Sequence, residues 1–117
     1  LKMVKPGVGG DDIHKGIQAL FEKRGYQSGL IDGANQGFIH GTGHGVGLDI
    51  HEQPGIGAAK TRLKAGHVIT IEPGVYYPEK KLGIRIEDVA VVREGHLENL
   101  TNYPTVLEVP LRGKRKK

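Results

Sequence analysis

The 117-residue chain has the length of one ordinary domain, and its 37% apolar and 26% charged residues are typical of a globular protein and exclude an intrinsically disordered chain. It contains no cysteine and no apolar run near the ~20 residues of a membrane-spanning helix, which excludes disulfides, thiolate metal sites and a membrane span. The formal net charge of +4 equals the charge of the basic run at residues 114–117. We therefore interpret residues 111–117 as a solvated basic tail and expect no membrane partner. Binding of nucleic acid through this basic run is the less favoured alternative.

The first predicted element is a helix over residues 11–24, where apolar side chains recur at the helical spacing. We expect Asp11 or Asp12 to cap its N-terminus, because a carboxylate there accepts hydrogen bonds from the free amides of the first turn. We expect Gly25 to end the helix, since glycine readily adopts the left-handed conformation that follows a helix.

The later elements are predicted strands, rich in β-branched residues and bounded by turn signals. They cover residues 67–72, 75–77, 83–93, 96–100 and 106–109. Residues 83–93 are expected to form one long buried strand, with residues 96–100 as its hairpin partner. One helix followed by several strands predicts an α+β fold with an antiparallel sheet.

The most unusual segment is residues 38–54, which combines alternating glycines with His40, His44 and His51. Seven of the 19 glycines lie in residues 37–57, and their flexible backbone can approach a ligand closely. The glycine spacing matches neither the dinucleotide-binding loop nor the phosphate-binding loop, which excludes both motifs. Because glycine disfavours a helix, we expect a site here to be built on loops or strands.

Two glutamates lie within apolar, strand-like runs. Glu72 ends the first run, and Glu87 lies in the second, where strand alternation places it on the same face as Arg85. Burial of a carboxylate is costly unless it is paired or binds a metal. Together with a histidine of the glycine-rich segment, the two carboxylates form an oxygen and nitrogen ligand set that suits Mn, Co, Zn or Fe.

Each of these residues also has a simpler interpretation. His44 can be an ordinary loop histidine, Glu72 a carboxylate at a strand end, and Glu87 the ion-pair partner of Arg85. No single residue decides between these alternatives. We expect the remaining histidines to lie at the surface: His14, His67 and His96.

In combination, three segments resemble the second half of the pita-bread metallopeptidases, which include methionine aminopeptidase, Xaa-Pro aminopeptidase, prolidase and creatinase. They are residues 40–52 (HGTGHGVGLDIHE), 70–74 (TIEPG) and 84–88 (IRIED). The paired histidines and residues 100–104 (LTNYP) are more similar to the Xaa-Pro aminopeptidase and prolidase branch. The resemblance implies that residues 1–110 form half of a pita-bread fold, with one or two helices packed on an antiparallel sheet.

The resemblance also implies a metal centre formed by His44, Glu72 and Glu87. Glu87 would bridge two divalent ions of the complete domain, and Glu72 would both bind metal and pass protons between the attacking water and the leaving amine. Such a pair of ions activates the water and polarises the scissile carbonyl.

Three more residues receive roles from the same resemblance. His51 would hydrogen-bond the substrate carbonyl and the tetrahedral oxyanion, and His40 would help to bind the substrate near the scissile bond. Arg85 would orient the carboxylates from behind the metal ligands.

The family's two remaining ligands are aspartates well upstream of the histidines, but only 43 residues precede His44 here. None of Asp11, Asp12 and Asp32 matches them, so the resemblance implies the C-terminal half of a catalytic domain. The first residue is Leu1 rather than Met, which also predicts a fragment or a processed product. Half a fold leaves a sheet edge and an apolar face uncovered, so we expect a homodimer or the missing N-terminal half as partner.

The expected function is therefore a metal-dependent peptidase of the Xaa-Pro aminopeptidase or prolidase type, which cleaves peptide substrates at the bond N-terminal to proline. The alternative is a non-catalytic pita-bread module that binds peptides or proteins. No secretory signal opens the chain, and we expect a cytoplasmic location.

Overall fold

The computed structural model describes residues 2–109, which form one α-helix, one short 3-10 helix and nine strands. The predicted α+β class is confirmed. Among these residues, no helix is long and apolar enough to cross a membrane. In chain order the elements are α1 (Gly10–Lys23), β1 (Gly29–Ile31), β2 (Ala34–Gln36), β3 (Gly43–Gly45), β4 (Glu52–Ile56), β5 (Val68–Ile71), β6 (Gly74–Tyr77), η1 (Pro78–Lys80), β7 (Leu82–Arg85), β8 (Asp88–Arg93) and β9 (His96–Asn99).

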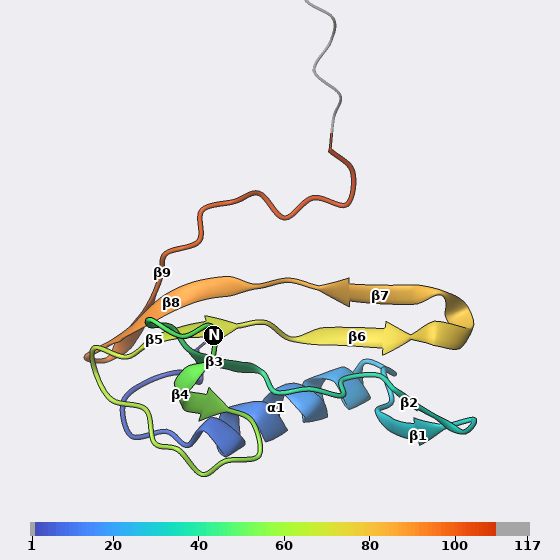
Figure 1. Ribbon diagram of the computed structural model, residues 1–117, viewed down its shortest axis with the longest axis horizontal. Helices are drawn as coiled ribbons and strands as arrows, with labels where there is room; N and C mark the ends of the chain where they lie inside the picture. Colours follow the sequence, from blue (N-terminus) through green and yellow to red (C-terminus); the bar gives the residue numbers. More distant parts are fainter. Residues whose placement is uncertain (1, 110–117) are drawn as a thin grey trace, which may run out of the picture.

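The main sheet is antiparallel and has the order β4-β3-β5-β8-β9. Two smaller sheets pair β1 with β2 and β6 with β7. Figure 1 shows β5 leading into β6 and β7 leading into β8 as one long pair of strands, with α1 along one side and the segment after β9 leading away from the body. The predicted hairpin of β8 and β9 is confirmed, and its tight turn contains Glu94 and Gly95.

Helix α1 begins one residue before the predicted position, and the predicted aspartate cap is wrong. Gly9 is the N-cap residue, and among the described residues no side chain caps the helix. Asp11 and Asp12 lie instead in the first turn, where their negative charges favour the positive end of the helix dipole. The predicted end is confirmed: Gly25 has φ +87°, and the following amide of Tyr26 donates to the carbonyl of Phe21 at 2.9 Å.

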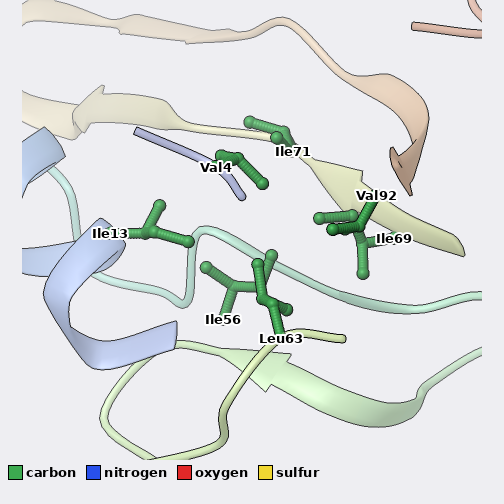
Figure 2. Close-up of a cluster of buried hydrophobic side chains, with 7 residues drawn as sticks. All are labelled: Val4, Ile13, Ile56, Leu63, Ile69, Ile71 and Val92. Atoms are coloured by element: carbon green, nitrogen blue, oxygen red, sulfur yellow. The ribbon is translucent and has the colours of Figure 1, made fainter. Parts of the chain in front are cut away.

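The core lies between α1 and one face of the main sheet. Figure 2 shows Ile13 of α1 on one side of the larger buried cluster and Ile69 and Ile71 of β5 on the other side. Successive side chains of a strand point to opposite faces. Burial of these two isoleucines on the helix side therefore directs Thr70 and Glu72 to the other face, where the candidate site lies.

The predicted long strand over residues 83–93 is wrong, because it is interrupted between β7 and β8. The opposite strand is interrupted at Glu72 and Pro73, between β5 and β6. Proline has no N–H and cannot continue the ladder of hydrogen bonds. Because the pairing of β5 with β8 and of β6 with β7 has one register, the gap at residues 72–73 faces the gap at residues 86–87.

Two further differences concern short elements. Residues 106–109 form no strand, and the hairpin of β1 and β2 was not predicted. Its turn consists of Asp32 and Gly33, with φ values of 51° and 81°. Aspartate followed by glycine is a strong signal for this kind of hairpin turn, so the hairpin could have been predicted from the sequence. The predicted basic tail at residues 111–117 lies outside the described residues.

We expect Gly43→Ala to lower the free energy of unfolding by about 1–3 kcal/mol, because the added Cβ would overlap the Thr70 carbonyl oxygen of the neighbouring strand β5. Gly55→Ala in β4 is the matched control, since a Cβ there meets open space. The control should be neutral or stabilising by up to about 1 kcal/mol. Urea unfolding measures both, and equal stabilities of the two variants would contradict the close approach of β3 to β5.

Candidate metal centre

His44, Glu72 and Glu87 form a group in which one ligand atom of each residue lies within 4.8 Å of the others. His44 lies in β3, Glu72 directly follows β5, and Glu87 directly precedes β8. The structure thus brings together the three metal ligands implied by the resemblance. The side chains of His44 and Glu72 are largely buried, whereas Glu87 is exposed.

The two glutamates meet because the long hairpin keeps one register across its gap. On one side of the gap Ile71 pairs with Asp88, and on the other side Gly74 pairs with Arg85. Continuing either register places Glu72 directly opposite Glu87. Like charges at such positions repel each other, so this pair favours a cation between the two carboxylates.

The orientation of His44 also fits a metal ligand. Its Nδ1 lies 2.9 Å from the carbonyl oxygen of Gly45 and donates to it, which leaves the lone pair of a neutral ring on Nε2. That Nε2 lies 3.2 Å from Oε1 of Glu72. A neutral imidazole nitrogen and a carboxylate oxygen both accept hydrogen bonds, so a proton or a metal cation is needed between them. Imidazole and carboxylate ligands suit Mn, Co, Zn and Fe.

Arg85 pairs with Glu72, not with Glu87. Its NH1 donates to Oε2 of Glu72 at 3.1 Å, and its Nε donates to the hydroxyl of Tyr76 at 2.7 Å. The hydrogen bond to Tyr76, more than the nearby carboxylates, raises the pKa of Arg85 above its ordinary value. Among the described residues Arg85 forms no ion pair with Glu87, because the strand break removes the alternation that would have placed the two side by side.

His40 and His51 line the same cavity as His44, Glu72 and Arg85, with a volume of about 290 Å³. The ring of His51 is exposed, and its centre lies 4.5 Å from the centre of the His44 ring. The Nδ1 of His40 lies 2.7 Å from the Gly41 carbonyl, and its Nε2 is buried without a hydrogen-bond partner among the described residues. A buried polar atom of this kind at an open cavity suits a hydrogen bond from a bound molecule.

Sequence analysis missed two residues around this site. Thr70 and Tyr76 contact Glu72 and Arg85, and strand alternation between positions 70 and 72 was a usable signal for Thr70. His14 was expected at the surface, which is wrong. It is half-buried, with Nδ1 at 3.0 Å from the Thr42 hydroxyl, because it follows the buried Ile13 at the edge of the apolar face of α1.

Comparisons with known proteins agree with this geometry. The sequence profile of metallopeptidase family M24 matches residues 1–94. An Xaa-Pro dipeptidase of Pyrococcus furiosus is 40% identical over 102 residues, which are 86% of this chain and 27% of the relative. The chain thus spans about a quarter of the length of the curated relatives that it matches.

Two solved structures show the same fold. An X-Pro aminopeptidase from Thermotoga maritima MSB8 superposes with a TM-score of 0.76 at 38% identity, over 89% of this chain and 27% of that structure. The prolidase from Pyrococcus horikoshii OT3 superposes with a TM-score of 0.77 at 35% identity, over 92% of this chain and 28% of that structure. Together they confirm the expected half of a pita-bread fold.

We expect the stability of the metal-free chain to fall as the pH decreases below about 6.5, partly through His14. Burial lowers the pKa of His14, and the nearby His40 lowers it further. In the unfolded chain His14 has an ordinary pKa of about 6.5, so below this pH the unfolded chain binds more protons than the folded chain. The free energy of unfolding therefore decreases until the pH falls below the pKa of His14 in the folded chain.

Substitution His14→Gln should reduce this loss of stability, and His96→Gln is the matched control because His96 is exposed. Urea midpoints between pH 8 and pH 5, with a chelator present, measure the effect. An equal reduction in both variants would rule out a special contribution of His14.

Proposed function

Because the chain belongs to metallopeptidase family M24, we propose that it carries part of the metal centre of an Xaa-Pro aminopeptidase or prolidase. The proposed reaction is hydrolysis of the peptide bond N-terminal to proline in a peptide substrate. The convergence of His44, Glu72 and Glu87 is the observation that carries this proposal. The P. furiosus relative is an Xaa-Pro dipeptidase and the T. maritima structure is that of an X-Pro aminopeptidase, which supports the substrate class.

His44, Glu72 and Glu87 would hold divalent ions, two of them in the complete domain, with Mn, Co, Zn and Fe as candidates. These ions would supply Lewis-acid activation of the attacking water and of the scissile carbonyl. Glu72 would also accept a proton from the water and return it to the leaving amine. Its Oε1 faces His44, and Arg85 donates to its Oε2 and holds the carboxylate in place.

His51 and His40 are proposed to contact the substrate. The exposed ring of His51 lies beside His44 and can donate a hydrogen bond to the substrate carbonyl and to the oxyanion that replaces it. His40 keeps Nδ1 on the Gly41 carbonyl, and its Nε2 has no partner within residues 2–109, so Nε2 can accept a hydrogen bond from an amide or amine of the substrate.

Residues 1–110 are proposed to be the C-terminal half of a catalytic domain, followed by the basic tail at 111–117. Side chains of β7 and of the gap after it, including Ile84 and Ile86, are nearly half exposed. The missing N-terminal half or a second copy of the chain would cover them. The cytoplasmic location stays a prediction.

The first test is hydrolysis of an Xaa-Pro dipeptide by the metal-stripped chain refilled with Mn²⁺ or Co²⁺. Glu87→Ala should weaken metal binding by at least about 100-fold and should abolish turnover. This is more than the loss expected when a residue that only hydrogen-bonds a metal ligand is removed. Glu94→Ala in the exposed turn before β9 is the matched control. Failure of the unaltered chain to bind either ion would contradict the metal centre, and binding without turnover would favour the non-catalytic module.

A second variant separates metal binding from substrate contact. His51→Ala should leave metal affinity unchanged and slow turnover by about 100-fold, because it removes a hydrogen bond to the oxyanion. His96→Ala on the exposed part of β9 is its control. Isothermal titration gives the metal affinity and dipeptide hydrolysis gives the rate; parallel losses of both would contradict the proposed role.

A further inference from the structure

We propose that the hydroxyl group of Thr70 is a positioning group for this metal centre. It joins two of the ligands and determines which oxygen of Glu72 faces His44. This inference rests on the proposed function, because it concerns the geometry of the same ligands. It assigns a role to a residue that would not itself touch metal or substrate.

The contacts of Thr70 reach both ligands at once. The residue is 3% exposed. Its Oγ1 accepts a hydrogen bond from the backbone N–H of His44 at 3.0 Å and donates one to Oε1 of Glu72 at 3.1 Å. The His44 carbonyl lies farther away, at 3.5 Å, so the single hydroxyl proton has Glu72 as its nearer acceptor.

The hydrogen bond from the His44 N–H to the Thr70 hydroxyl lies between two ladder hydrogen bonds of the same strand pair. Ladder hydrogen bonds between β3 and β5 lie on either side, from Val46 to the Val68 carbonyl and from Glu72 to the Thr42 carbonyl. Between them, the N–H of His44 donates to the hydroxyl of Thr70 at 3.0 Å. An N–H that is partly removed from water favours a partner, so this hydrogen bond helps to fix the backbone that carries the His44 ring.

The same hydroxyl distinguishes the two oxygens of Glu72. The terminal torsion of a glutamate is broad and nearly two-fold, so rotation alone would exchange Oε1 and Oε2. Thr70 donates to Oε1, and Arg85 donates to Oε2. These two donors hold Oε1 at 3.2 Å from Nε2 of His44 and keep Oε2 on the side of Arg85.

The test compares Thr70→Val, which keeps the β-branched shape but loses the hydroxyl, with Thr70→Ser, which keeps the hydroxyl. Mn²⁺ affinity of the full chain, measured by isothermal titration, should fall by about 10–100-fold for valine and stay within about threefold of the unaltered chain for serine. Thr101→Val is the matched control, since it also deletes a threonine hydroxyl that accepts a strand N–H, that of Val89. It should leave the affinity unchanged.

A second readout needs no metal. Amide hydrogen exchange at His44 should accelerate in Thr70→Val and not in Thr70→Ser, because only valine leaves that N–H without its acceptor. Unchanged Mn²⁺ affinity in a folded Thr70→Val variant would overturn the proposal. An Mn²⁺ affinity of Thr70→Ser as low as that of Thr70→Val would also overturn it. If the unaltered chain binds no Mn²⁺, the proposed metal centre fails, and exchange at His44 decides the role of Thr70 separately: unchanged protection in the valine variant overturns it.

Discussion

The long hairpin keeps one register through a gap in both of its strands, and the candidate site depends on this constraint. Ladder hydrogen bonds hold the strands together on both sides of the gap, so Glu72 and Glu87 have to face each other within it. Pro73 has no N–H to continue the ladder. The interruption therefore leaves two carboxylates opposite each other, of which Glu72 is paired with Arg85, and the repulsion between them favours a cation in the gap.

The third ligand reaches this gap because β3 lies very close to β5. A side chain at Gly43 would overlap the backbone of Thr70, so only glycine permits the approach. On the other face of β5, Ile69 and Ile71 are buried in the same core cluster as Ile13 of α1. The same alternation of side chains that builds the core thus directs Thr70 and Glu72 toward His44. Burial of the core face of β5 also fixes the register of the strand, and therefore the positions of Thr70 and Glu72 on its other face.

Much of the fold was predictable because its signals are local. The helix, its end at Gly25 and the tight turn between β8 and β9 each depend on residues that are neighbours in the sequence. The break in residues 83–93 was not predictable in this way. Its apolar, β-branched composition is that of a continuous strand, and the interruption faces Pro73 on the opposite strand. His14 was misplaced for a similar reason, since its partner Thr42 is 28 residues away.

The sequence by itself determined the family of the protein and the identity of the candidate ligands, since ordered motifs with fixed spacing are properties of the chain. Only the tertiary structure decided how those ligands are oriented. It paired Arg85 with Glu72 instead of Glu87, and it placed the hydroxyl of Thr70 between His44 and Glu72. The physical reason is that a hydrogen bond depends on the distance and direction between two atoms. When the atoms lie on different strands, the register and packing of those strands set both quantities.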